Sequence, residues 1–452
     1  MITIVEPKEH IDKLWGKQRI RDGDTYRIMR YVLRVDHDSK VLLHNVITGQ
    51  LVVLDQNEAR VVTNMPLVYT TVMEQLVADH YLVPEDYDEH QQVVNMRNIL
   101  RMLSDSQKSE AITRYTILPT TACNARCYYC FEQGVESYTM SEQIANDVVE
   151  YISNNCNKKP IHISWFGGEP TVASHRIDQI CLGLREKGIQ YKSDMTTNGY
   201  LFDEDMVNRS VKDWHVTLVM VCVDGTEENY NKTKAYVNAT DNPYERVMQN
   251  IGMLLGQGVR VNLRMNIDLD NYRDFYELCS EAVHRFHESP LLQVYVHPIV
   301  GEHRNRDGAV NHGSEAWFSE KIVELNDAAR SLSLYRGDGY LPSLLHGCMA
   351  SSDSTITINA KGKLVKCPEQ FADNQTIGDL LHGITNKQLA DSWKEFSDYP
   401  RCVGCALFPA CARMKNCSAK DRCNYQFEIL RQVKSALCVR YDKWKHIVDL
   451  DE

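Results

Sequence analysis

The chain has 452 residues, a length that accommodates two to four domains with cores of their own. Hydrophobic residues make up 43% and charged residues 25%, as in ordinary globular proteins, and no apolar run reaches membrane-spanning length. The N-terminus lacks a signal-peptide pattern, so we expect a cytoplasmic protein without a membrane partner. The net charge of −11 argues against nucleic acid as a partner, because a phosphate backbone repels an acidic surface.

The N-terminal part of the chain has a strand-rich pattern. Residues 1–25 are polar and charged, and they predict an irregular arm. Asn57 is a candidate helix cap, and helical periodicity and a short last strand follow within residues 58–84. Three strands ahead of these short helices predict a winged-helix-like module, and polar residues 86–110 predict a linking helix. The three strands are expected at residues 30–35, 40–44 and 49–54.

From residue 112 the chain alternates strands with helices. Six such units predict a parallel sheet that closes part-way into a barrel. Loops at the carboxyl ends of its strands are then expected to carry function. Residues 301–345 predict a less regular bridge, and a final helix is expected over residues 424–445. The six candidate strands are residues 115–119, 161–166, 192–197, 216–223, 260–267 and 293–298.

The chain contains 15 cysteines, and their distribution is uneven. In a reducing compartment such a number indicates metal binding or catalysis rather than disulfides. Three cysteines lie between residues 123 and 130, and eight lie between residues 348 and 438. The other four have apolar neighbours and are expected to be buried as small hydrophobic residues. These four are Cys156, Cys181, Cys222 and Cys279.

Cys123, Cys127 and Cys130 have the spacing Cys-x3-Cys-x2-Cys and follow the first predicted barrel strand. Three thiolates in eight residues can bind three irons of a cubane cluster and leave the fourth iron without a protein ligand. Such an open iron is a place where chemistry can occur. A zinc site or incidental cysteines are the alternatives, although zinc knuckles more often pair two Cys-x2-Cys units.

This spacing, with Tyr129 before the last cysteine, resembles the signature of the radical S-adenosylmethionine (SAM) enzymes, in which SAM chelates the open iron. Gly167, Gly168 and Glu169 follow the second predicted strand. The glycines allow close approach of backbone to a ligand, and the carboxylate can accept from an amine. Their position resembles the family's motif for the methionine amino group of SAM.

The ends of the next three strands also carry polar residues. By the same resemblance, Thr197 and Asn198 would lie near the ribose and methionine of SAM. Lys234 stands where relatives often have arginine for the SAM carboxylate; a lysine cannot make arginine's bidentate fork, so Arg264 is the other candidate. Turn chemistry or a solvated charge remains open for each residue. The cofactor-binding residues implied by the resemblance are Tyr129, Gly167, Gly168, Glu169, Thr197, Asn198, Lys234, Arg264 and Asn266.

The C-terminal cysteines resemble the SPASM domain, which carries two auxiliary [4Fe-4S] clusters. A zinc ribbon is the alternative for the Cys402/Cys405 pair. The family spacing Cys-x3-Cys is replaced here by Cys-x5-Cys between Cys411 and Cys417. Cys438 is either a helix core residue or a substitute final ligand. By analogy Cys348, Cys367 and Cys417 would hold the first auxiliary cluster, and Cys402, Cys405, Cys411 and Cys423 the second.

The predicted fold class is α/β, a partial (β/α)6 TIM-like radical SAM barrel between two further modules. The N-terminal module is similar in pattern to the peptide-recognition element of ribosomal-peptide maturases, which adds a leader peptide as a strand. DNA binding by a winged helix is the alternative, and the acidic composition argues against it. The expected divisions are a recognition module with linker (1–110), a barrel (111–300), a bridge (301–345) and a SPASM domain (346–452).

The resemblance implies an enzyme with three [4Fe-4S] clusters that cleaves SAM to a 5′-deoxyadenosyl radical, with flavodoxin or ferredoxin as electron donor. We expect it to modify a precursor peptide by an oxidative thioether or carbon–carbon crosslink. A sulfatase-maturing, formylglycine-forming enzyme is an alternative. Such enzymes tend to have aspartate where this chain has Pro368, although Glu369 could serve as the base. A peptide epimerase and a non-catalytic iron–sulfur or zinc scaffold are the others.

Overall fold

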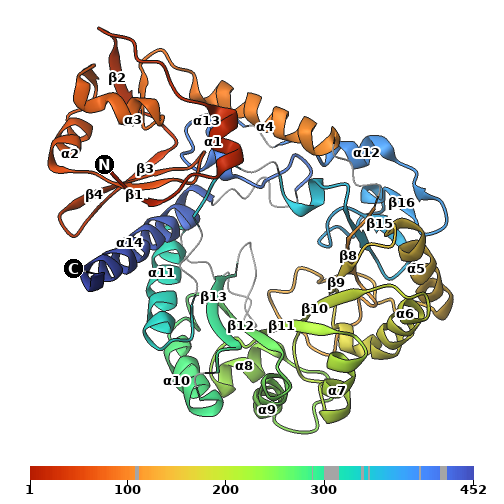
Figure 1. Ribbon diagram of the computed structural model, residues 1–452. Helices are drawn as coiled ribbons and strands as arrows, with labels where there is room; N and C mark the ends of the chain where they lie inside the picture. Colours follow the sequence, from red (N-terminus) through yellow and green to blue (C-terminus); the bar gives the residue numbers. More distant parts are fainter. Residues whose placement is uncertain are drawn as a thin grey trace.

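The computed structural model describes residues 1–106, 111–287, 289–299, 315–336, 341–344, 347–396, 399–417 and 425–451 (Figure 1). A curved sheet dominates the structure. Its six parallel strands lie side by side in chain order, at the positions that the sequence predicts to within two residues. They are β8 (Arg114–Ile117), β9 (Ile161–Trp165), β10 (Tyr191–Thr197), β11 (Val216–Cys222), β12 (Arg260–Ile267) and β13 (Leu292–Pro298).

Helices cover the outer side of this curved sheet (Figure 1). Their starts follow local capping rules: Ser141 and Asp203 accept hydrogen bonds from the first turns of two of them, and Pro243 begins a third. The buried strand residues that pack against these helices include Trp165, Met195 and Leu263. The helices are α5 (Glu142–Asn155), α6 (Ser174–Glu186), α7 (Glu204–Lys212), α8 (Glu227–Lys234), α9 (Pro243–Gly256), α10 (Asp274–Phe286) and α11 (Glu315–Ser331).

The sheet continues beyond the six expected strands. β14 (Thr355–Ile358) pairs parallel with β8, on the side opposite β9. Three antiparallel strands then follow, which brings the sheet to ten strands: β15 (Lys363–Val365), β16 (Gly378–Asp379) and β17 (Gly383–Ile384). The first part of the predicted C-terminal module is therefore joined to the barrel by main-chain hydrogen bonds. Two short helices, α12 (Lys387–Ser392) and α13 (Pro400–Val403), come next.

The N-terminal module contains two small sheets, β1-β5-β4-β3 and β6-β2-β7. The prediction of an irregular arm over residues 1–25 is wrong, because β1 pairs with β5 and α1 follows β1. Asp55, not Asn57, caps α2, in a capping box with Glu58. The elements are β1 (Ile2–Val5), α1 (Glu9–Trp15), β2 (Thr25–Ile28), β3 (Val32–His37), β4 (Lys40–Asn45), β5 (Leu51–Val53), α2 (Gln56–Thr63), β6 (Leu67–Val68), α3 (Glu74–Ala78), β7 (Leu82–Pro84) and α4 (Glu89–Ser106).

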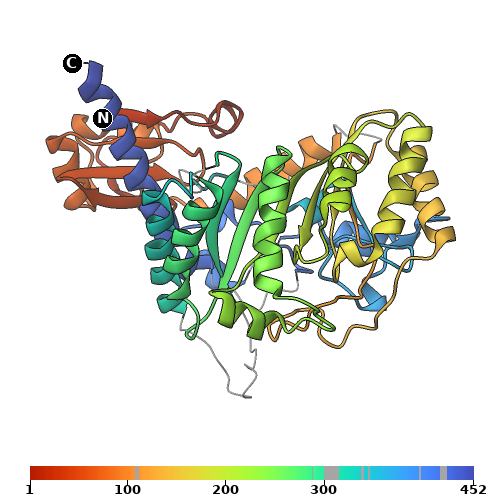
Figure 2. The ribbon, with the colours of Figure 1, turned by 90° about the horizontal axis from the view of Figure 1, so that it is seen from below.

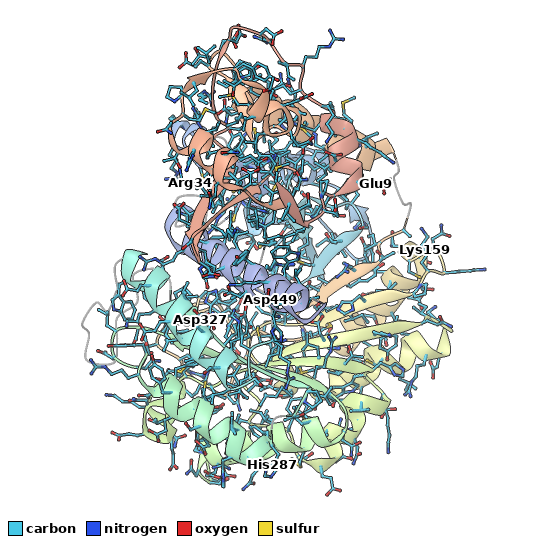
Figure 3. All side chains as sticks on the ribbon, turned by 60° about the vertical axis from the view of Figure 1, so that its left-hand side comes forward. Glu9, Arg34, Lys159, His287, Asp327 and Asp449 are labelled. Carbon is cyan, nitrogen blue, oxygen red and sulfur yellow. The ribbon has the colours of Figure 1, made fainter. Side chains whose placement is uncertain are left out.

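The last helix, α14 (Tyr425–Asp451), packs against the N-terminal module. It packs on β1 and β3 and along α11, and its Val433 and Leu437 belong to the core of the N-terminal module. Figure 3 shows this helix, marked by Asp449, between the N-terminal module, marked by Arg34, and α11, marked by Asp327. The same neighbourhood is seen from below in Figure 2. The N-terminal module and the C-terminal segment thus share one hydrophobic core.

The bridge predicted at residues 301–345 is partly regular, because α11 packs against β13 and α10. Residues 301–314, 337–340 and 345–346 of this bridge lie outside the described residues. None of the helices in the described ranges is both long and apolar enough to span a bilayer.

Candidate active site

The loop that follows β8 carries Cys123, Cys127 and Cys130 at the carboxyl edge of the sheet. The turn is tight: the Cys130 N–H donates to the Cys127 carbonyl at 3.2 Å, and the Ala125 N–H points to the Cys123 Sγ at 3.4 Å. The loop is also tied to the end of α8. Arg126 N–H donates to the carbonyl of Lys234 at 2.7 Å, and the Val237 N–H, just beyond α8, donates to the Asn124 carbonyl at 2.8 Å. These contacts fix the backbone that presents the three thiols.

All three thiols are half-buried, and no cysteine in the described ranges forms a disulfide. Burial raises the pKa of Cys123 to about 12 and that of Cys127 to about 11, while the ammonium of Lys234 opposes the shift at Cys127. The charges of Cys127 and Cys130 add to the rise in the pKa of Cys123, and the charge of Cys130 adds to the rise in the pKa of Cys127. No group of three or more Cys, His, Asp or Glu among the described residues is arranged to hold a metal ion. A cubane cluster does not need ligands that converge on one metal ion, because each thiolate binds its own iron.

Gly167 and Gly168 pack against the backbone of the cysteine loop. A Cβ on Gly167 would lie 2.4 Å from the Thr120 carbonyl oxygen, and one on Gly168 would lie 2.4 Å from that of Ala122. Gly167 also has a φ of +114°, a conformation that side chains disfavour. These glycines were expected to allow close approach of a ligand; the structure shows that they allow close approach to the backbone that precedes Cys123.

Glu169 is buried and accepts hydrogen bonds from two neighbouring strand ends. Its Oε1 accepts from the Thr171 hydroxyl and N–H at 2.5 and 3.1 Å and from the Thr197 hydroxyl at 2.7 Å. Its Oε2 accepts from the Asn198 N–H at 2.7 Å. Burial raises the pKa of Glu169, and these four donors oppose the rise. Oε1 accepts from three donors and Oε2 from one, so Oε2 keeps acceptor capacity for a further donor.

Asn198 connects the carboxylate to the cysteine loop. Its side-chain amide donates to Asn124 Oδ1 at 2.7 Å and lies 4.0 Å from the Cys123 Sγ. The cysteine loop, Glu169 and Asn198 come from three different strand ends. The structure therefore brings together the three motifs that the sequence placed at one edge of the sheet.

Lys234 and Asn266 meet Tyr129 at a buried position behind the loop. Lys234 Nζ forms an ion pair with Asp224 at 2.8 Å and donates to the Tyr129 hydroxyl at 3.0 Å. Asn266 donates to the same hydroxyl at 3.0 Å. The ammonium that sequence analysis considered for the SAM carboxylate has Asp224 and Tyr129 as its partners. Asp224 was not among the predicted site residues, although its position in an Asp-Gly turn after β11 was the available signal.

Arg264, the other carboxylate candidate, lies on the inner side of β12 beside Cys222 of β11. The two residues are register partners, and a guanidinium nitrogen lies 3.3 Å from the Cys222 sulfur. Within the described part of the chain, the Arg264 Nε is buried without a hydrogen-bond partner. Cys222, expected as a buried small hydrophobic residue, is buried, but its neighbour is charged. Arg264 keeps donor capacity for an anionic group.

The C-terminal cysteines fall into separate neighbourhoods. Cys417 adds to the rise in the pKa of Cys348 and of Cys367, and Cys348 and Cys367 pack on Trp393 and Met414. Cys402, Cys405 and Cys411 lie on or near α13 and the short 3-10 helix Phe408–Ala410. Cys423 lies outside the described residues. Cys438 is on α14, where burial and the carboxylates of Asp442 and Asp327 raise the pKa of its thiol.

Two features of this C-terminal part were missed by sequence analysis. Arg97 of α4 is buried and donates to the Pro409 and Cys411 carbonyls at 3.0 and 2.9 Å, so the predicted linker helix holds the cysteine turns. Phe371, four residues after Cys367, lies 6.1 Å from the ring of Phe131 in the cysteine loop, measured between centroids. Glu369, the candidate base, is exposed. Neither missed contact has a local sequence signal, because each joins distant parts of the chain.

Comparison with protein families gives a match to the model described as Radical SAM superfamily, over residues 117–282. The chain carries a radical SAM domain. The match begins at the end of β8 and includes the cysteine loop, Glu169 and Asn198. A curated relative, described as a probable GTP 3′,8-cyclase of Methanocaldococcus jannaschii, is 28% identical over 171 residues. That match covers 36% of this chain and 53% of the relative, so the chain spans about half the length of the curated relative.

Two solved structures resemble a larger part of the chain. Native anSMEcpe with bound AdoMet and Cp18Cys peptide has a TM-score of 0.55 at 16% identity and covers 75% of this chain and 99% of its own. Streptococcus suis SuiB bound to precursor peptide SuiA has a TM-score of 0.51 at 14% identity and covers 86% of this chain and 94% of its own. At these identities the likeness concerns the fold.

The residues present fit the groups that a radical SAM domain holds. The three half-buried thiols of Cys123, Cys127 and Cys130 are a donor set for an iron–sulfur cluster. The free acceptor side of Glu169 suits an ammonium, and the unpartnered Nε of Arg264 suits a carboxylate. Glu132, two residues beyond Cys130, has both carboxylate oxygens buried without hydrogen-bond partners in the described part of the chain. Sequence analysis did not single it out, and its only signal is its place after the last loop cysteine.

Proposed function

We propose that the protein is a radical SAM enzyme that modifies a ribosomally made precursor peptide by an oxidative intramolecular crosslink. The observation that carries the proposal is the convergence of the cysteine loop, Glu169 and Asn198 at one edge of the sheet. A radical SAM domain over residues 117–282 supports the first part. The two neighbouring structures with bound peptides support a peptide substrate.

In this proposal Cys123, Cys127 and Cys130 hold a [4Fe-4S] cluster whose fourth iron binds SAM. Glu169 and Asn198 receive the methionine part of SAM, and Thr197 orients the Glu169 carboxylate through the bond between them. When bound, cluster and SAM supply a 5′-deoxyadenosyl radical that removes a hydrogen atom from the substrate. The protein orients the reacting groups and excludes water.

The remaining cofactor assignments extend the same proposal. Cys348, Cys367 and Cys417 are proposed for a first auxiliary [4Fe-4S] cluster, a grouping that their mutual proximity supports. Cys402, Cys405 and Cys411 with Cys423 are proposed for a second. An oxidative crosslink releases electrons, and auxiliary clusters are suitable acceptors. A flavodoxin or ferredoxin is the proposed reductant.

Substrate recognition is proposed to use the N-terminal module. A peptide can add to a sheet by pairing with an outer strand, with main-chain bonds giving affinity. In the sheet β1-β5-β4-β3 the outer strands are β1 and β3, because β1 covers the side of β5 that faces away from β4. The leader of the precursor peptide is therefore proposed to pair with one of these two outer strands.

Anaerobic reconstitution followed by incubation with reductant, SAM and the precursor peptide encoded beside the gene tests the proposal. We expect deoxyadenosine and a peptide that is two mass units lighter per crosslink. A peptide of unchanged mass that incorporates deuterium from solvent would indicate an epimerase. Conversion of one Cys or Ser to formylglycine would indicate the sulfatase-maturing activity. Zinc as the bound metal, with no deoxyadenosine formed, would reject the radical enzyme in favour of a scaffold.

A further inference from the structure

A buried polar quartet lies directly behind the cysteine loop. It consists of Tyr129 from the loop, Asp224 after β11, Lys234 at the end of α8 and Asn266 on β12. Asp224, Lys234 and Asn266 have exposed fractions of 0%, 2% and 4%. Buried charges need partners because desolvation is costly, so an ion pair at such a site has a defined geometry.

Every polar atom at the centre of the quartet has a partner. Asp224 Oδ1 accepts from the main chain and side chain of Asn266 at 3.0 and 2.9 Å. Asp224 Oδ2 accepts from Lys234 Nζ at 2.8 Å and from the Tyr129 hydroxyl. The Tyr129 hydroxyl in turn accepts from Lys234 and Asn266. Satisfaction of all these groups makes the quartet a rigid unit.

Lys234 contacts the cysteine loop with both its backbone and its side chain. Its carbonyl accepts from the Arg126 N–H at 2.7 Å, in the middle of the loop. Its ammonium donates to the hydroxyl of Tyr129, which lies between Cys127 and Cys130 in the sequence. The helix ends there because Ala235 adopts a left-handed conformation with φ of 45°. The fold thus places one buried cation against the back of the loop.

Both charges of the ion pair contact the Tyr129 hydroxyl of the loop: Lys234 Nζ donates to it at 3.0 Å, and Asp224 Oδ2 accepts from it. Burial raises the pKa of Cys127, and Lys234 opposes this rise more strongly than Asp224 reinforces it. At Cys130 Lys234 also acts against the rise that burial causes.

We propose that the Lys234–Asp224 pair, held by Tyr129 and Asn266, sets the reduction potential of the cluster at Cys123, Cys127 and Cys130. Lys234 and Asp224 are positioning residues in this role. The inference rests on the proposed function, because it requires an iron–sulfur cluster on these thiols. A buried positive charge stabilises the more negative, reduced cluster and raises its potential, whereas a buried carboxylate lowers it.

The test is anaerobic redox titration of the full-length reconstituted protein, following the electron paramagnetic resonance signal that changes when SAM is added. That signal reports the SAM-binding cluster even if other clusters are present. The variants are K234M, D224N and K234R, with K232M as the matched control, because Lys232 is exposed on the same helix. We expect a negative shift of the midpoint potential for K234M and a positive shift for D224N. K234R should lie nearer to wild type than K234M, and K232M should match wild type.

Shifts of the same sign for K234M and D224N would overturn the inference, since loss of packing alone gives no reason for opposite signs. Potentials of both variants equal to that of K232M would overturn it too. If K234M fails to take up the cluster, D224N decides alone: a zero or negative shift rejects the role. A wild-type protein without any SAM-responsive signal would instead reject the proposed function.

Discussion

Asn198 and Glu169 face each other across the ends of β9 and β10, with the Asn198 N–H donating to the Glu169 Oε2 at 2.7 Å. The side chain of the same asparagine reaches Asn124 in the cysteine loop at 2.7 Å. One residue thus links the carboxylate that is proposed to receive the SAM amine with the loop that is proposed to hold the cluster. Changes at Glu169 are therefore expected to affect both ligand binding and local order.

Replacement of Glu169 by glutamine is predicted to weaken SAM binding by about tenfold to a hundredfold, because the variant loses a charged acceptor for an ammonium. The new amide group would also face a donor, either a threonine hydroxyl or the Asn198 N–H. Such a mismatch costs about 1–3 kcal/mol of stability. Equilibrium binding of SAM to the reconstituted protein and thermal unfolding measure the two effects. E186Q, an exposed site on α6, is the control; unchanged SAM affinity in E169Q would contradict the assignment.

Replacement of Gly168 by alanine is predicted to displace the cysteine loop. The added methyl group would lie 2.4 Å from the Ala122 carbonyl oxygen and 2.6 Å from that of Thr121, too close for either backbone atom to remain in place. We expect loss of the SAM-responsive cluster signal and about four fewer irons per chain, one cubane's content. Iron analysis after reconstitution measures this change.

Gly256 provides the matched control for that substitution. A Cβ at this position has no neighbour within 4 Å, and G256A should be neutral or slightly stabilising, because alanine favours the helix. If G168A keeps the iron content and the signal of G256A, the glycine does not support the loop as the geometry indicates.

Local patterns predicted the barrel strands because long alternations of apolar residues have a strong signal, and β12 has the same bounds in prediction and structure. The pattern of Ile2–Val5 is too short for such a signal, and only pairing with β5 makes it a strand. Lys234 shows the same limit at the site. Its candidacy as a ligand came from its position along the chain, whereas its contact with Tyr129, 105 residues away, depends on the folded barrel. Contacts of this kind leave no local pattern.

Iron analysis is expected to distinguish the two roles considered for Cys438, a core residue of the helix or a cluster ligand. Among the described residues, the charges that act on its thiol are the carboxylates of Asp442 and Asp327, not another cysteine, whereas the charge of Cys417 acts on the thiols of Cys348 and Cys367. C438S should keep the iron content of the wild type. C417S, at a residue close to Cys348 and Cys367, should lose about four irons per chain. An equal loss in C438S would make Cys438 a cluster ligand.

The N-terminal module is predicted to lose stability as the pH falls, because it buries a neutral histidine. His44 lies 3.1 Å from the Gln50 carbonyl and 2.8 Å from the Pro342 carbonyl; burial lowers its pKa from 6.5 to about 4 and outweighs these two carbonyls, which favour the protonated ring. Since the pKa is lower in the folded chain, its contribution is complete above pH 6.5 and is lost as the pH falls toward 4. The loss is at most ~3 kcal/mol. Urea unfolding between pH 7 and pH 5 should show a smaller loss in H44Q than in wild type. H10Q, at an exposed residue of α1, is the control, and equal losses in all three proteins would contradict the prediction.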